Sequence, residues 1–180
     1  MNIFVLDEDI ERSAEYHNDK HVVKMILELT QILCTVNHKS GLAAPYKPTH
    51  SHHPCVKWTG TSIENWRYLR WLVFCLNEEY KYRFNHTKNH KAFEVAINLR
   101  EPAIPDIPRT PFVLAMPEEC YDPCPVKAYR TYYQKHKQHL AKWTKRAAPP
   151  WWRTNNDQEI ITTIPISIST KDIVPMDRVY

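Results

Sequence analysis

The sequence predicts a mainly α-helical fold: a compact helical domain with a central polar-striped helix, a short N-terminal strand and an irregular, proline-rich C-terminal half. Three observations support this fold class. Apolar residues recur at helical spacing over long segments, most clearly over residues 19–38 and 62–84. Runs with β character are short and lie towards the two ends of the chain. A length of 180 residues fits one domain with a real core and needs no disulfide or metal staple.

The individual elements follow from local signals. Residues 2–6 form a β-like run that is long enough for a short strand at most. Each predicted helix begins near a residue that can cap its amino end or occupy its first turn. The predicted helices are residues 10–16 (Asp7 or Asp9), 19 to about 38 (Asn18 or Asp19), 62–84 (Ser62), 90–99 (Asn89) and 125 to about 145 (Pro125).

One domain over residues 1–180 is the expected organisation. Residues 1–100 would form its helical core, and residues 101–180 would supply a wrapping segment, a basic helix and a tail. The stretch 101–125 is rich in proline and is expected to be extended. The tail over residues 158–173 is β-branched, which fits a strand or an arm.

Composition excludes several classes of protein. Only two glycines are present, so the glycine-rich phosphate loops of ATPases, kinases and Rossmann dehydrogenases are absent, and no cofactor is expected. No apolar run is long enough to cross a bilayer, and the N-terminus lacks the order of a signal peptide. Five scattered cysteines are best explained as reduced thiols, which predicts a cytoplasmic protein, in the host cell if a phage encodes it.

The strongest functional signal is a polar stripe on the helix predicted from residue 19. Residues His17, His21, Lys24, Glu28 and Gln31 are spaced by four, three, four and three, so they share one narrow strip. The rest of this helix is apolar nearly all the way round, which predicts that it crosses the middle of the domain and turns the stripe towards a cleft. The alternative is that the histidines and the glutamate are core polar groups that bridge helices.

Two further sets of residues extend this prediction. The loop at 46–58 adds His50 and His53, for which acid–base or phosphate-contact roles are favoured. Zinc or iron held by His17, His21, His50 and His53 is the alternative, although no HExxH or CxxC motif accompanies them.

The second set lies in a basic stretch. Residues 127–153 carry eight positive charges and no acidic residue, interleaved with aromatic residues, as a nucleic-acid-binding face requires. The alternative is a solvated amphipathic helix. The predicted nucleic-acid-binding residues are Lys47, Arg130, Lys137, Lys142, Lys145, Arg146, Trp151, Trp152 and Arg153.

A set of ordered residues in the first half of the chain resembles a known family. They are Asp9, Ser13 and Ala14; then Asp19, Lys20, Lys24, Glu28, Gln31, Ile32 and Leu33; then His53, Pro54, Trp58 and Gly60; and finally Glu79 and Arg83. This pattern resembles the pyrimidine-dimer DNA glycosylases of the endonuclease V type, and short phage proteins are similar as well. The resemblance implies an all-α domain that kinks DNA, flips a nucleotide and cleaves its glycosidic bond through an amine–sugar imine.

The sequence departs from that family at two positions. The family's nucleophile is the α-amine exposed when the initiator methionine is removed, and Asn2 normally blocks this removal. The family's arginine–glutamate pair falls at Lys20 and His21. We therefore expect Lys20 or Lys24 as nucleophile or phosphate anchor, and Glu28 or Asp19 as the supporting carboxylate.

A nucleic-acid-acting enzyme is the predicted function, most specifically a DNA N-glycosylase/lyase or a related base-processing enzyme. Its partner would be nucleic acid, with DNA favoured, or a nucleotide, and the oligomeric state is open. A metal-dependent nucleotide or nucleic-acid hydrolase with histidine ligands is one alternative. A non-catalytic DNA-binding accessory protein is another.

Overall fold

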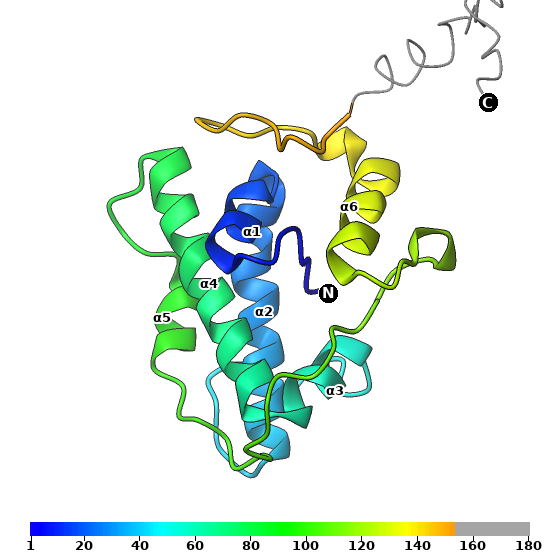
Figure 1. Cartoon of the computed structure of the whole chain (residues 1–180). Coiled ribbons are helices and arrows are strands. Elements are labelled where there is room, and N and C mark those ends of the chain that lie inside the picture. The colour runs from blue at the N-terminus through cyan, green and yellow to red at the C-terminus, as the bar shows by residue number, and fades with distance from the viewer. Residues whose placement is uncertain (154–180) are drawn as a thin grey trace, which may run out of the picture.

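The computed structural model describes residues 1–153 and consists of helices joined by long loops (Figure 1). The helices are α1 (Ile10–Tyr16), α2 (Asp19–Lys39), α3 (Pro54–Thr61), α4 (Ile63–Phe84), α5 (Lys91–Ile97) and α6 (Pro125–His136), with the 3₁₀ turns η1 (Glu118–Cys120) and η2 (Gln138–Leu140). The mainly α-helical fold class is therefore confirmed. Within these residues no helix combines the length and the apolar character needed to cross a membrane.

The centre of the fold is the antiparallel pair α2 and α4 (Figure 1). Arg83 in the last turn of α4 donates to the carbonyl of His17, just before α2, which brings the end of one helix to the start of the other. One side of α2 is buried as its periodicity predicts. Its core residues are Val22, Met25, Ile26, Leu29, Ile32, Leu33 and Val36. Another side of α2 is less buried than its apolar sequence predicted, because Val23 and Leu27 are 37% and 39% exposed.

The predicted N-terminal strand is not present. Residues 2–6 form a buried, irregular segment that passes between α2 and α6 (Figure 1). Side chains satisfy part of its backbone: Ser13 Oγ accepts from the Leu6 amide at 3.0 Å. Asn2 Oδ1 accepts from the Ile3 amide at 2.8 Å. The neighbours are helices, whose backbone groups are already paired, so the segment has no strand to bond with.

Two helices differ from the sequence prediction. The helix α3 was missed, although His53 caps it and Pro54 occupies its first turn. The basic helix ends at His136 and does not continue to residue 145. The following chain turns across the start of α2, where the carbonyl of Lys142 accepts from the Asp19 amide at 2.8 Å.

The proline-rich segment after α5 runs along α3 and α4 (Figure 1). Side chains from these helices hold its backbone, because the segment has no regular hydrogen-bond ladder of its own. Trp58 Nε1 donates to the carbonyl of Pro111 at 2.8 Å. Asn65 accepts from the Thr110 amide at 3.0 Å. The segment thereby reaches α6 and the N-terminus. The tail at 158–173 lies outside the described residues.

Candidate active site

The middle of the polar stripe meets the N-terminal amine. The α-amine of Met1 lies 3.4 Å from Glu28 Oε2, and Lys24 Nζ lies 3.1 Å from Glu28 Oε1. The side chains of Met1 and Glu28 are 4% and 16% exposed, whereas that of Lys24 is 64% exposed. One carboxylate therefore bridges two amines at the edge of the core.

Asn2 fixes the position of this amine. Its Nδ2 donates to the carbonyl of Ala115 at 2.8 Å, and its Oδ1 accepts from the hydroxyl of Tyr129 at 3.0 Å. Tyr129 in turn donates to the carbonyl of Val113 at 2.8 Å. Asn2 is itself buried. These contacts join the N-terminus to α6 and to the proline-rich segment, so residue 1 is held in place by residues more than a hundred positions away.

His53 completes the neighbourhood of the amine. Its Nδ1 accepts from the Cys55 amide at 3.2 Å, which caps α3. Burial lowers the pKa of His53, and the charges of the N-terminal amine and His50 lower it further, whereas Glu28 opposes the shift. A neutral imidazole, a carboxylate and an amine thus lie within electrostatic reach of one another. His50 is exposed, has a left-handed backbone (φ 49°), and its Nδ1 lies 2.6 Å from Thr49 Oγ1.

The two histidines that begin the stripe have a different environment. His17 and His21 are buried against Phe4 and α6, and the His21 ring stacks on Phe4 at 4.6 Å. His17 Nδ1 contacts the carbonyl of Ser13 at 2.7 Å, and His21 Nδ1 contacts the hydroxyl of Tyr133 at 2.5 Å. Burial lowers the pKa of His17 to about 4 and that of His21 to about 3. Both are therefore neutral near pH 7 and belong to the core.

A buried ion-pair network occupies the end of α4. Arg83 lies 3.3 Å from Asp19 and 2.8 Å from Glu79, and its side chain is completely buried. Arg146 contacts the other oxygen of Glu79 at 2.5 Å. Asp19 also accepts from the Thr144 amide at 2.9 Å and from its hydroxyl at 2.7 Å. The Asp19 carboxylate therefore accepts from three donors within the fold, whereas the contacts of Glu28 are the two amines. Lys20 is exposed on the next position of α2.

Much of the basic stretch is engaged with the protein itself. Arg130 donates to the carbonyl of Leu6 and to Asp7, both at 2.8 Å. Lys145 donates to the carbonyl of Tyr82 at 2.7 Å. Lys137 lies over the Tyr132 ring at 4.9 Å. Trp151 and Trp152 are partly buried and pack against the core. The remaining predicted nucleic-acid-binding residues, Lys47, Lys142 and Arg153, are exposed.

The four histidines proposed as alternative metal ligands do not gather into one group. His17 and His21 lie in the core, whereas His50 and His53 lie in the loop before α3. Among residues 1–153, the one group of at least three potential metal ligands with converging atoms is Glu119, Cys120 and His136.

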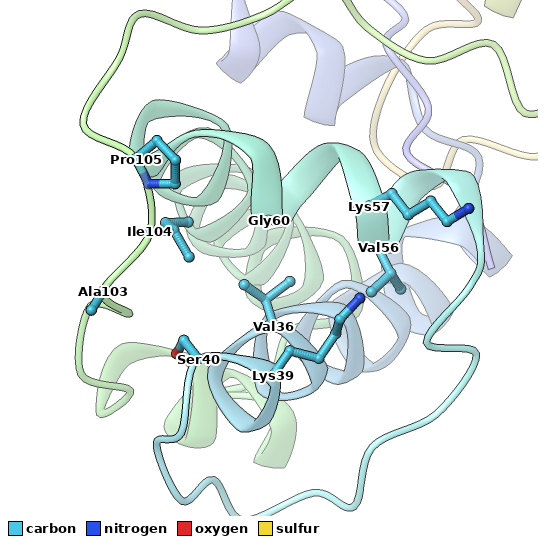
Figure 2. Close-up of a pocket in the computed structure, with 9 residues that line it drawn as sticks. All are labelled: Val36, Lys39, Ser40, Val56, Lys57, Gly60, Ala103, Ile104 and Pro105. Carbon is cyan, nitrogen blue, oxygen red and sulfur yellow. The ribbon is translucent and has the colours of Figure 1, made fainter.

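A separate cavity of about 380 Å³ opens at the far end of α2 (Figure 2). Val36 faces Gly60 of α3 across it, and Lys39 and Lys57 stand at its edge. Glu28 lies two helical turns before Val36 on α2, so the cavity is distinct from the amine–carboxylate pair. The residues that line it include neither a carboxylate nor a histidine, and its charged groups are the two lysines.

The structure brings three of the candidates named from the sequence, Lys24, Glu28 and His53, close to the α-amine of Met1, which was not among those candidates. The available signal was the second residue: an asparagine there retains the methionine, so the chain would carry its own first amine into the fold. The polar Asn2 at the head of the apolar run 3–6 also fits an anchored terminus.

Comparison with known proteins identifies a family for the first half of the chain. A family model described as pyrimidine dimer DNA glycosylase matches residues 1–92. The match includes Met1, Glu28 and His53, together with all of α1 to α4. Neither the curated proteins nor the solved structures gave a match. Since the family match covers more than half of the 180 residues, the chain belongs to the pyrimidine dimer DNA glycosylase family, a family of DNA-repair enzymes.

Proposed function

We propose that this protein is a DNA glycosylase in which the α-amine of Met1 attacks the sugar and Glu28 assists it. The observation that carries the proposal is the 3.4 Å contact between the amine and the Glu28 carboxylate. An amine held beside a carboxylate is the arrangement that amine–sugar covalent catalysis needs. The family match, which begins at residue 1, supports the same reaction class.

The reaction follows from these two groups. The neutral amine nitrogen attacks C1′ of a flipped nucleotide, the bond between C1′ and the base breaks, and the base leaves with the electron pair and takes up a proton. Glu28 accepts the proton that the amine loses and returns it to the ring oxygen O4′ as the C1′–O4′ bond opens. The product is an imine between the protein and the opened sugar, and water hydrolyses it to regenerate the amine.

Met1 is the better nucleophile of the two amines that contact Glu28. The buried Asn2 holds the Met1 amine in position beside Glu28. The Met1 side chain is 4% exposed, against 64% for Lys24, which is therefore free to reach a DNA phosphate. We assign Lys24, Lys20 and His50 to phosphate contacts, and neutral His53 to proton transfer or orientation at the sugar.

Borohydride trapping tests the proposal directly. The full-length protein is incubated with duplex DNA that contains a cyclobutane pyrimidine dimer, or another base lesion from a panel, and sodium borohydride reduces any imine to a stable amine. We expect a covalent protein–DNA adduct, and mass spectrometry of its peptides should place the DNA on the N-terminal peptide. The intact mass of the free protein must show that Met1 is retained.

Matched variants locate the nucleophile. Lys24→Gln should preserve the adduct, whereas Glu28→Gln should abolish it. A protein whose α-amine has been selectively acetylated should form none. An adduct mapped to Lys20 or Lys24 would reject Met1 as the nucleophile while keeping the glycosylase function. Base release without any adduct, from every lesion that is cleaved, would reject the imine mechanism.

A further inference from the structure

We infer that Glu119, Cys120 and His136 form a binding site for a zinc ion. The three side chains offer a carboxylate oxygen, a sulfur and an imidazole nitrogen, and these ligand atoms all lie within 4.8 Å of one another. The site shares no residue with the amine–Glu28 pair, so each proposal can fail without the other.

Two elements bring the ligands together. Glu119 and Cys120 belong to the single turn η1, and His136 ends α6, which packs against that turn. Lys135 Nζ donates to the carbonyl of Glu119 at 3.0 Å and ties η1 to α6 beside the ligands. The site is therefore arranged before an ion arrives, which reduces the ordering cost of binding.

The geometry of His136 supports a ligand role. Its Nε2 lies 3.2 Å from Glu119 Oε1, and a tetrahedral zinc ion with bonds of about 2.0 Å separates a nitrogen and an oxygen ligand by about 3.3 Å. The same Nε2 is shielded from solvent and has no hydrogen-bond partner. This nitrogen is therefore left without a partner although a carboxylate oxygen and a thiol lie within 4.8 Å of it, and a metal ion would give it one.

The donor set selects the ion. A thiolate and an imidazole suit zinc, whereas magnesium and calcium require oxygen ligands throughout. Cys120 is 1% exposed, and its thiol gives up its proton when the ion binds. Three protein ligands leave the fourth position for a water molecule. Partial exposure of Glu119 and His136, 54% and 36%, gives the ion a path from solvent.

Zinc at this position would stabilise the segment that holds Asn2 and the N-terminus in place. The turn η1 follows directly after residues 113–116, whose carbonyls at Val113 and Ala115 accept from Tyr129 and Asn2. A metal that joins η1 to α6 shortens the free loop between these contacts and the helix. Because the site shares no residue with the amine–Glu28 pair, the ion is assigned to bracing this loop, without part in the sugar chemistry.

The test uses the full-length protein, purified under reducing conditions, stripped of metal and dialysed against zinc or cobalt(II). Elemental analysis should find one zinc ion per chain. The cobalt form should show a thiolate-to-cobalt charge-transfer band and the intense visible bands of a tetrahedral site. Cys120→Ser and His136→Ala should each weaken zinc binding by more than the roughly 10–100-fold that loss of an outer-shell partner costs.

Cys124→Ser is the matched control, because Cys124 lies four residues from Cys120 but outside the ligand group. It should retain both the zinc and the charge-transfer band. Cobalt spectra of the unmodified protein without a thiolate band would overturn the site, whether or not the variants fold. Equal loss of zinc from Cys124→Ser and Cys120→Ser would also reject the ligand assignment.

Discussion

The two halves of the polar stripe lie along one line at α2, yet their environments are opposite. His17 and His21 at the start of the stripe are covered by α6 and by Phe4. Lys24 and Glu28, one and two turns further on, meet the N-terminal amine and solvent. Residues with the same spacing therefore serve the core in one half and the candidate active site in the other.

The difference shows that packing partners, not residue type, determine what a polar side chain does here. The chain after α6 folds back across the start of α2 and donates two hydrogen bonds to Asp19, so we expect that half to contribute mainly stability. The N-terminal amine lies beside Glu28, where we propose that it reacts. Mutations at the start of the stripe should therefore change stability, and mutations of Glu28 should change activity.

The largest expected loss of stability is at the covered half of the stripe, where α6 and Phe4 bury His17 and His21. Arg83→Ala removes a fully buried guanidinium and leaves the carboxylates of Asp19 and Glu79 without their shared partner. Loss of one member of a buried ion pair should lower the free energy of unfolding by about 3–5 kcal/mol. Urea denaturation measures it. Arg67→Ala is the control, because Arg67 is 47% exposed and water screens its ion pairs, so its loss should cost far less. Equal losses for the two variants would show that the network is not stabilising.

The buried histidines should make the fold sensitive to acid. Burial lowers the pKa of His17 from 6.5 to about 4, so the unfolded chain binds a proton more readily than the folded one. The free energy of unfolding should therefore fall as the pH drops below about 6.5, and His17 alone should account for about 3 kcal/mol by pH 4. Urea denaturation at pH 7 and pH 4.5 measures the loss. His17→Gln should show a shallower dependence, and an unchanged slope would assign the acid sensitivity elsewhere.

The sequence alone predicted what depends on local periodicity. Apolar spacing located α4 to within one residue at its start, 62 against Ile63, and placed Lys24 and Glu28 on one line. The burial of His21 depends on Tyr133, which is 112 positions away in the sequence. The position of the Met1 amine depends on Ala115 and Tyr129. Long-range contacts of this kind leave no periodic signal. The sequence could therefore place the stripe on one side of the helix, but it could not show that His17 and His21 are buried while Glu28 meets the N-terminus.

Within the open half, Glu28→Gln should have the largest effect on activity. The substitution preserves shape but removes the carboxylate that faces the amine at 3.4 Å. Loss of an acid–base group typically slows a reaction by 10²–10⁴-fold, so we expect base release to fall at least about 100-fold. Single-turnover kinetics on lesion-containing DNA measures it. The matched control is Asp19→Asn, which should lower stability and leave the rate of the folded protein within a few fold. If Asp19→Asn slowed base release and Glu28→Gln did not, the active site would lie at the covered half of the stripe instead.

Substitution of Lys24 should have the smallest effect, and it tests DNA binding separately from base release. Its side chain is 64% exposed, so Lys24→Gln should change the free energy of unfolding by less than about 0.5 kcal/mol. If Lys24 contacts a phosphate, the variant should bind DNA a few fold more weakly, and the slope of log K against log salt should decrease by about 1. Fluorescence anisotropy over a salt series measures both. Lys145→Gln is the comparison from the basic stretch, because Lys145 already donates to the carbonyl of Tyr82 at 2.7 Å. An equal change of slope for both lysines would mean that the DNA contacts the basic stretch as well as Lys24, and an unchanged slope for Lys24→Gln would reject its phosphate contact.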